Sequence, residues 1–313
     1  MPNAQPLDHL YHQLDPGGCR LLNPPERIWL FGGKGEFRMG STKTCESLRE
    51  SFWRQSLALT FSPSRTWPGL LDIPENHSGW WAFSGYDDLL TFERDACHLA
   101  RAIILFPESP GSLAELGALA VDDSIVDRLL VVVQERYLRP NYRESFLNLG
   151  PLKRVQARQH QCVIRAETTT DLTSDDFENI IEFVDARLPL DPEKQKLRVV
   201  NPMHKLLLIA DLVDLLLIAR PRELQAVLNF FRVEISIPEL ERVAKLLEFF
   251  GLVRIDNWGL ELFFRRPEHQ SRTWVDYTSR DGQPTFDRSR FKVDRKALIA
   301  TDRRQMAVYG RSV

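Results

Sequence analysis

The sequence predicts an α/β protein in which a doubly wound parallel sheet is followed by a smaller, mainly helical domain. Short apolar runs such as Ile103–Phe106 and Leu129–Gln134 alternate with helical patterns, which is typical of parallel strands buried on both faces. After residue 201, three helical patterns precede a hairpin pattern. A chain of 313 residues is long enough for two separate cores.

The composition excludes several classes of protein. With 43% hydrophobic and 27% charged residues, the chain resembles ordinary globular proteins, and its net charge of −2 excludes a uniformly basic nucleic-acid-binding protein. Its four cysteines are scattered and its seven histidines lack metal-ligand spacing, so we expect no disulfide framework and no metal site. The polar start and the lack of a long apolar run predict a cytoplasmic protein without membrane contact.

The first strand and its glycine loop follow a polar N-terminal extension, residues 1–25. The apolar run Arg27–Phe31 reads as a strand and leads into Gly32-Gly-Lys-Gly35. Glycines let backbone N–H groups approach a phosphate, so Gly32 and Gly33 are candidate substrate-binding residues. An ordinary turn at the end of a strand explains the same pattern.

Three segments lie between this loop and the central strand. We expect a helix within Thr42–Leu59, a second strand near Leu57–Phe61, and an irregular stretch, Ser62–Gly85. This stretch is either a lid or a disordered loop, and its tryptophans either stack on a ligand or only pack the loop down. Asp87–Ala100 then reads as a helix that carries Glu93. This glutamate either lines a pocket or is a solvated helix acid.

The central strand, Ile103–Phe106, ends in a Pro/Gly turn that opens another helix. The carboxyl edge of a parallel strand is where ligands bind. The turn places five residues there: Glu108, Ser109, Gly111, Ser112 and Glu115. A carboxylate at that edge suits chemistry at an anomeric carbon. The alternative is structural, with Ser112 as N-cap and Glu115 completing a capping box.

The rest of the first domain continues the alternation. We expect the helix to extend over Leu116–Leu129, a buried strand at Leu129–Gln134, and a loop with a short helix over Arg136–Pro151. A last strand is expected within Val155–Ile164. Residues 171–201 then form a polar helix and a linker.

Residues 202–265 predict a winged helix. Three helical patterns, Pro202–Ala219, Pro221–Phe231 and Ile237–Phe250, lead into a hairpin pattern at Ile255–Phe264. The third helix carries several acids, which would repel phosphates. We therefore expect this domain to dock proteins more than nucleic acid.

The extension that follows, residues 266–313, is basic and contains interleaved aromatic residues. That combination suits nucleic acid, and Arg288, Arg290 and Arg295 are its candidate contacts. A solvated, charged extension is the alternative.

Two sequence motifs together carry a resemblance to a known family. Phe106-Pro-Glu-Ser-Pro-Gly-Ser112 followed by Glu115-Leu-Gly-Ala118 resembles the active-site turn of nucleoside deoxyribosyltransferase-like proteins. It resembles more closely the effector subunits of bacterial retrons. Ile28-Trp-Leu-Phe-Gly-Gly33 and Ser145-Phe-Leu-Asn-Leu-Gly-Pro151 fit the same family. The resemblance implies a Rossmann-like domain of the deoxyribosyltransferase type over residues 26–170, followed by the winged helix.

The resemblance also implies a function. It points to the toxic effector of a retron anti-phage system, which hydrolyses the N-glycosidic bond of NAD as its substrate and needs no other cofactor. Glu115 would be the nucleophile or cation stabiliser, assisted by Glu93 or Glu108, while Gly32, Gly33 and the hydroxyls of the turn would bind phosphate or ribose. The implied partners are a reverse transcriptase and its multicopy single-stranded DNA and RNA. Self-association into oligomers or filaments is implied as well.

Two alternatives stay open. One is a nucleoside or nucleotide N-glycosidase or deoxyribosyltransferase, and the other is a non-enzymatic, nucleotide-sensing DNA-binding regulator. The turn departs from the deoxyribosyltransferase pattern, because Glu108-Ser109-Pro110 stands where those enzymes commonly have an aspartate. This difference favours hydrolysis over transfer between nucleosides.

Overall fold

The computed structural model describes residues 6–22, 26–38, 43–59, 67–82, 85–166, 170–188, 194–268 and 272–310. The chain divides into two compact units. The α/β unit comprises residues 25–83 and 87–191, and the helical unit comprises residues 1–24, 84–86 and 192–313. The α/β unit therefore extends past the expected boundary at residue 170.

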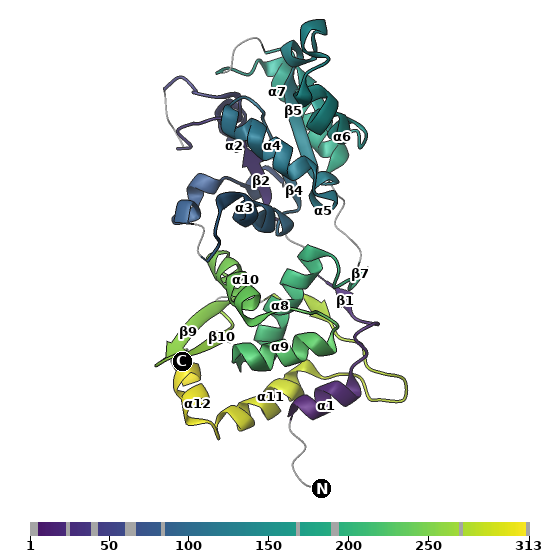
Figure 1. Cartoon of the computed structure of the whole chain (residues 1–313), viewed down its shortest axis with the longest axis vertical. Helices are drawn as coiled ribbons and strands as arrows, with labels where there is room; N and C mark the ends of the chain where they lie inside the picture. The colour runs from purple at the N-terminus through teal and green to yellow at the C-terminus, as the bar shows by residue number, and fades with distance from the viewer. Residues whose placement is uncertain are drawn as a thin grey trace. The chain divides into compact units, whose positions relative to one another are not determined.

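A five-stranded parallel sheet forms the centre of the α/β unit (Figure 1). Its strands lie in the order β3-β2-β4-β5-β6. Their bounds are Ile28–Phe31 for β2, Leu71–Asp72 for β3, Ala102–Leu105 for β4, Leu129–Gln134 for β5 and Gln161–Ile164 for β6. The mixed α/β class and its parallel sheet are thus confirmed, and the arrangement is compatible with a Rossmann-like fold.

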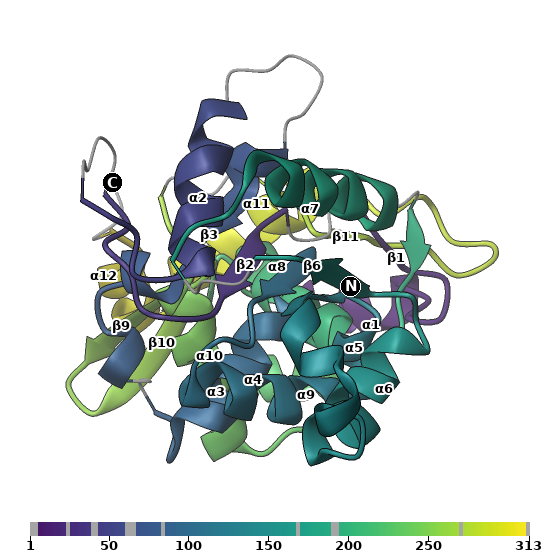
Figure 2. The same cartoon turned by 90° about the horizontal axis from the view of Figure 1, so that it is seen from above.

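Helices cover both faces of this sheet, which explains why its central strands are apolar throughout. Helices α2 (Leu48–Leu59) and α7 (Ser174–Arg187) lie on one face, and α3 (Leu89–His98) and α4 (Pro110–Ala120) lie on the other (Figure 2). Phe52 of α2 and Ile180 of α7 share one buried cluster with Ile104. Because successive side chains of a strand point to opposite faces, both sides of β2, β4 and β5 need apolar residues.

Several expected element boundaries were wrong. Leu57–Leu59 ends helix α2 instead of starting a strand. The rest of that expected strand, residues 60 and 61, lies outside the described residues. Strand β3 forms one edge of the sheet, and it lies within a stretch that was expected to be irregular. Helix α4 stops at Ala120, and the separate helix α5 (Asp123–Val126) follows.

The segment after β5 is mostly short turns of helix. It contains η4 (Glu135–Leu138), η5 (Pro140–Tyr142), the π-turn η6 (Asn148–Leu152) and α6 (Lys153–Gln156). The last strand, β6, is shorter than expected, because α6 occupies residues that the sequence suggested were strand.

Three helices and a small antiparallel sheet form the first part of the helical unit. The helices are α8 (Pro202–Leu216), α9 (Pro221–Phe230) and α10 (Ile237–Phe249). The sheet has the order β8-β10-β9, with bounds Ile218–Ala219 for β8, Arg254–Trp258 for β9 and Glu261–Arg265 for β10. Gly259 turns the β9–β10 hairpin at a φ of +60°, a conformation that glycine adopts without strain.

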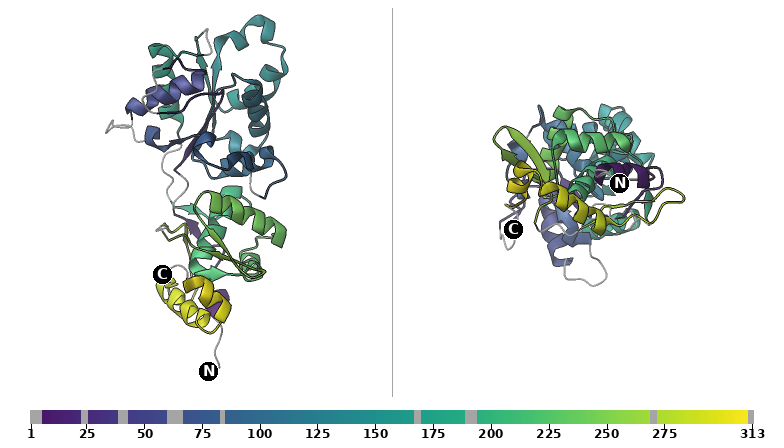
Figure 3. Two further views of the ribbon diagram at one scale, coloured as in Figure 1. Left: turned by 90° about the vertical axis from the view of Figure 1, so that its left-hand side faces the viewer. Right: turned by 90° about the horizontal axis from the view of Figure 1, so that it is seen from below.

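The basic C-terminal segment is folded onto this unit. Strand β11 (Val275–Asp276) pairs with β1 (Arg20–Leu21), which also pairs with β7 (Gln195–Lys196). Helix α11 (Arg288–Ile299) packs on α8, α12 (Arg303–Tyr309) follows it, and α1 (Pro6–Gln13) lies along α11 (Figures 1 and 3). Among the described residues, no helix is both long enough and apolar enough to cross a membrane.

Candidate active site

Glu115 lies in the second turn of helix α4, just beyond the carboxyl end of β4. The helix begins at Pro110, and its N-cap is Ser109, whose Oγ accepts the N–H of Ser112 at 3.2 Å. The Ser112 hydroxyl accepts the N–H of Ser109 at 2.9 Å in return. The expected capping box of Ser112 and Glu115 is therefore wrong, and the cap does not use the carboxyl group of Glu115.

The Glu115 carboxyl group is buried next to another acid. Its Oε2 is shielded from solvent and has no hydrogen-bond partner among the described residues. Burial, and then the negative charge of Glu93, raise its pKa to about 7, while Arg49 acts in the opposite direction. A buried carboxyl without a structural partner and with a perturbed pKa is typical of a functional group.

Glu93 lies on α3 and is fixed by an indole. Its Oε1 accepts the Nε1–H of Trp80 at 3.1 Å, and its side chain is buried. The Trp80 ring is itself held edge-on against Trp29, with 5.0 Å between ring centroids. Burial raises the pKa of Glu93, the bond from Trp80 lowers it, and the charge of Glu75 raises it again. The structure therefore brings Glu93 and Glu115 together, and Trp80 belongs to the packed wall beside them.

Glu108 holds the turn together. Its two carboxylate oxygens accept three backbone N–H groups, from Gly33 at 3.0 Å, Leu48 at 2.8 Å and Arg49 at 3.0 Å. Burial raises the pKa of Glu108, and these bonds oppose that rise. The structure corrects its expected role as an assisting acid or base, because both oxygens are used to tie the β2 loop to the start of α2. We call this arrangement the Glu108 clasp.

The glycine loop is packed tightly. A Cβ on Gly32 would lie 2.9 Å from the Cβ of Arg49, and one on Gly33 would lie 2.9 Å from the Cβ of Ser47. The N–H of Gly33 already donates to Glu108. Gly33 thus serves the clasp, and its N–H is not available to a phosphate.

The remaining predicted binding residues belong to the helix cap. The hydroxyls of Ser109 and Ser112 lie 3.0 Å apart and bond to the turn itself. There is free space around Gly111, since the atom nearest to a Cβ at this position would be the Ser109 Oγ at 3.9 Å. The expected phosphate or ribose contacts of these three residues remain predictions.

Sequence reasoning missed Arg49 and Glu75. Arg49 is buried on α2 and donates to both carboxylate oxygens of Glu75, at 2.9 and 2.5 Å, and its guanidinium carbon lies 4.3 Å from the centroid of the Phe37 ring. Arg49 could have been identified from the sequence, because it is a charged residue among the buried positions of a helix. Its partner could not, because Glu75 comes from the segment expected to be irregular.

The site therefore combines three carboxylates, Glu75, Glu93 and Glu115, with the guanidinium of Arg49. This excess of negative charge suits a substrate that is cationic or becomes cationic in the transition state. Within the described part of the chain, no group of three or more His, Cys, Asp or Glu side chains could hold a metal ion.

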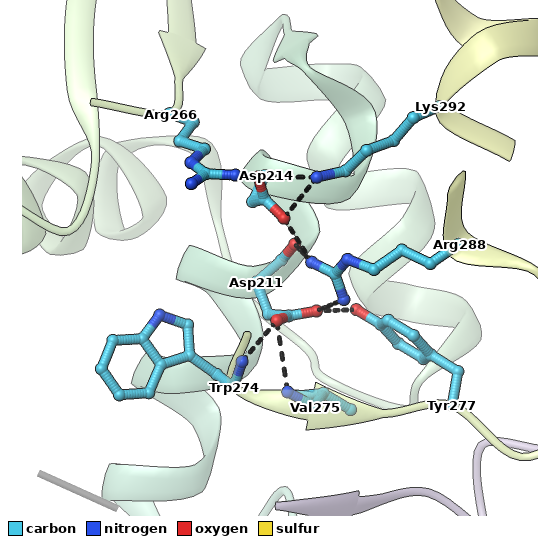
Figure 4. Close-up of polar contacts among 8 residues, drawn as sticks. All are labelled: Asp211, Asp214, Arg266, Trp274, Val275, Tyr277, Arg288 and Lys292. Carbon is cyan, nitrogen blue, oxygen red and sulfur yellow. Dashed lines mark hydrogen bonds and ion pairs between the residues drawn. The ribbon is translucent and has the colours of Figure 1, made fainter. Parts of the chain in front are cut away.

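The predicted nucleic-acid contacts of the C-terminal segment lie in a different environment (Figure 4). Arg288 pairs with Asp211 at 2.8 Å and also with Asp214. Asp211, fully buried, accepts two backbone N–H groups and the hydroxyl of Tyr277 as well. Figure 4 shows the two aspartates extending from α8 toward Tyr277 and Arg288 of the C-terminal segment.

Arg295 is also internal. It is buried, bonds to the carbonyl oxygen of Ile218 at 3.2 Å and pairs with Glu223 at 2.9 Å. These contacts correct the expectation for Arg288 and Arg295, since their guanidinium groups stabilise the fold. Of the three arginines, Arg290 alone is exposed.

The fold and the site define a class of protein: a two-unit α/β protein with a cluster of acids beyond a central parallel strand. The chain belongs to the STM3845 retron effector protein family, whose family model matches residues 46–255, more than half of the chain.

Two curated relatives from Escherichia coli support the same family. The chain is 31% identical over 87 residues to the "Retron Ec86 putative ribosyltransferase/DNA-binding protein", which is 28% of this chain and 27% of the relative. It is 35% identical over 75 residues to the "Retron Ec73 putative ribosyltransferase/DNA-binding protein", 24% of this chain and 23% of the relative. The matched region thus spans about a quarter of each relative's length.

Proposed function

We propose that this retron effector is the toxic component of an anti-phage system and that it hydrolyses the N-glycosidic bond of NAD. Its family and the name "putative ribosyltransferase" of two relatives support chemistry at a ribose carbon. The observation that carries the proposal is the carboxyl group of Glu115 beside Glu93, whose Oε2 is shielded from solvent and has no hydrogen-bond partner among the described residues.

The charge of the cluster favours NAD over a neutral nucleoside. The nicotinamide ring of NAD is a pyridinium cation, and the sugar becomes oxocarbenium-like as the glycosidic bond breaks. Negative charge from Glu93 and Glu115 stabilises both species, whereas that of Glu75 is offset by its pair with Arg49. Because the pKa of Glu115 is about 7 in the free protein, a bound cation would lower it and leave the carboxylate ionised.

The proposed reaction balances as follows. The bond between the ribose C1′ and the nicotinamide nitrogen breaks, its electron pair stays on the nitrogen, and neutral nicotinamide leaves. Ionised Glu115 stabilises the resulting cation or bonds to C1′. Water then supplies the hydroxyl of ADP-ribose and releases a proton. Buried Glu93, oriented by Trp80, is the group placed to accept a hydrogen bond from a ribose hydroxyl or from that water.

We further propose that residues 26–170 form a deoxyribosyltransferase-like domain and residues 202–265 a winged helix. Helices α8, α9 and α10 followed by the β9–β10 hairpin support the second assignment. The acidic third helix makes this domain a docking module for protein. Its partner would be the retron reverse transcriptase with its multicopy DNA and RNA, which restrains the enzyme in an assembly that contains several effector copies.

The test compares Glu115→Gln with a matched control, Glu178→Gln, an exposed glutamate on α7. Each effector is expressed alone and beside its neighbouring retron genes, and growth, NAD and released nicotinamide are followed. We expect wild type and Glu178→Gln to consume NAD when expressed alone. Glu115→Gln should be slower by several orders of magnitude. Normal hydrolysis by Glu115→Gln would exclude the assigned role, and intact NAD with another nucleotide consumed would exclude the substrate.

A further inference from the structure

The segment that follows strand β5 forms a basic surface of the α/β unit. Residues 135–158 contain six Lys or Arg and two Glu, in a chain whose net charge is −2. The segment lies at the carboxyl edge of the sheet, and its η6 turn packs against α4, the helix of Glu115. We call residues 135–158 the β5 platform.

Large apolar side chains of the β5 platform face solvent. Phe146 is 85% exposed, Leu149 59% and Tyr142 44%. A single exposed apolar side chain is ordinary, but several within one short segment are typical of an interaction surface. The packing of the segment itself therefore has to account for the solvent exposure of these side chains.

The platform is ordered by its own polar contacts. The side-chain amide of Asn148 donates to the carbonyl oxygens of Tyr137 at 2.7 Å and Tyr142 at 2.8 Å. The rings of these two tyrosines meet edge-on, with 6.1 Å between their centroids. These contacts fix the backbone that carries Phe146 without burying its ring, so the ring is presented on a preformed surface.

Unpaired cations lie in the same segment as the exposed rings. Arg139, Arg143 and Lys153 are exposed and form no ion pair with any residue that the structure describes. An open groove of about 420 Å³ lies beside Leu149 and Lys153, the first residue of α6. Two further arginines line this groove, but Asp123 and Asp127 neutralise them: Arg154 pairs with Asp123 at 2.8 Å and Arg158 with Asp127 at 2.6 Å.

We infer that the β5 platform binds single-stranded nucleic acid. Unpaired cations attract phosphates, and exposed aromatic rings on a fixed backbone stack on unpaired bases. A second copy of the chain fits this surface less well, because a symmetric contact would place the two sets of cations against each other. The inference goes beyond the proposed hydrolysis and does not depend on it.

The test measures binding of the full-length chain to a fluorescently labelled oligothymidine of about 20 nucleotides by fluorescence anisotropy over a range of salt concentrations. The variant Arg139→Glu/Arg143→Glu/Lys153→Glu is compared with a control that reverses three exposed cations of α9, α11 and α12, Arg222→Glu/Lys296→Glu/Arg303→Glu. Both variants change the net charge equally. Circular dichroism checks that both are folded.

We expect the platform variant to bind at least about 10-fold more weakly. The slope of log affinity against log salt should be smaller in size by about 2, since three phosphate contacts are lost and each contributes roughly 0.7 for single strands. The control should bind like wild type. Phe146→Ala should weaken binding several-fold without changing the salt dependence, because it removes stacking and no charge. A duplex of the same sequence length should compete poorly.

Equal losses in both charge variants would show a general charge effect and overturn the inference. So would unchanged binding by the platform variant. If Phe146→Ala instead lowers the molecular mass in solution and leaves nucleic-acid binding intact, the surface joins copies of the chain. Nicotinamide release, measured in parallel, separates this result from the proposed hydrolysis, because neither outcome for binding requires a change in activity.

Discussion

The position of Glu115 predicts that replacing it with glutamine stabilises the protein at alkaline pH. The ordinary pKa of a glutamate is 4.5, and in the folded protein that of Glu115 is about 7. Since the folded state holds the proton more tightly than the unfolded state, ionisation of this group destabilises the fold as pH rises from 4.5 toward 7. The stabilisation that comes from the proton bound to Glu115 is fully present when the pH is below the pKa of the unfolded state. It is lost as the pH rises through the pKa of the folded state.

The size of the effect follows from that rise. A pKa raised from 4.5 to about 7 corresponds to about 3 kcal/mol of lost stability above pH 7. Glutamine avoids this cost but brings a buried amide, and leaving the amide unpaired costs about 1 kcal/mol. Glu115→Gln should therefore be more stable than wild type by about 2 kcal/mol at alkaline pH and no more stable at acidic pH.

The assay is urea denaturation of purified wild type, Glu115→Gln and Glu178→Gln at about pH 5 and about pH 8. The exposed Glu178 should give no difference at either pH. A Glu115→Gln protein that is less stable than wild type at the higher pH would refute the reasoning, because it would mean that the carboxylate makes a stabilising contact. A difference that does not change with pH would refute it too.

Two further predictions concern other buried contacts. Asp211→Ala leaves two backbone N–H groups and the Tyr277 hydroxyl without their acceptor and removes one of the two carboxylate partners of Arg288. It should destabilise the protein by about 3–5 kcal/mol in urea denaturation, whereas Asp294→Ala on the exposed side of α11 should stay within about 0.5 kcal/mol. Stability losses of similar size in both variants would contradict the assigned role of Asp211. Trp80→Phe keeps an aromatic ring but removes the hydrogen-bond donor to Glu93, and this loss raises the pKa of the Glu93 carboxyl group. The acidic limb of the pH profile for nicotinamide release should therefore move to higher pH. An unmoved limb would show that Glu93 does not act in its ionised form.

Local patterns predicted the parts of the fold that local physics determines. The fully apolar runs at β2, β4 and β5 identified the parallel sheet, since only strands buried on both faces read that way. Edge strand β3 could not be found, because two residues, Leu71 and Asp72, carry no periodic pattern. The true N-cap of α4 could have been recognised from Ser109 followed by Pro110, which is favoured at the first helical position.

The site was predicted less completely, because its contacts join distant parts of the chain. Glu115 and Glu93 were identified from the turn and the preceding helix, and the structure brings them together. Glu108 was read as an acid or base, yet its role depends on backbone N–H groups 59 to 75 residues earlier. Arg295 was interpreted as a nucleic-acid contact, and its partner Glu223 lies 72 residues away, which no charge pattern reveals.

Strand β1 constrains the order in which the chain can fold. Leu21 pairs with Gln195 on one side and with Val275 on the other, so the early strand has no partners until most of the chain has been made. The α/β unit needs only residues 25–191, and its sheet and carboxylate cluster are complete before β11 exists. During synthesis, the unit that carries Glu115 can therefore fold while the helical unit is still waiting for its last strand.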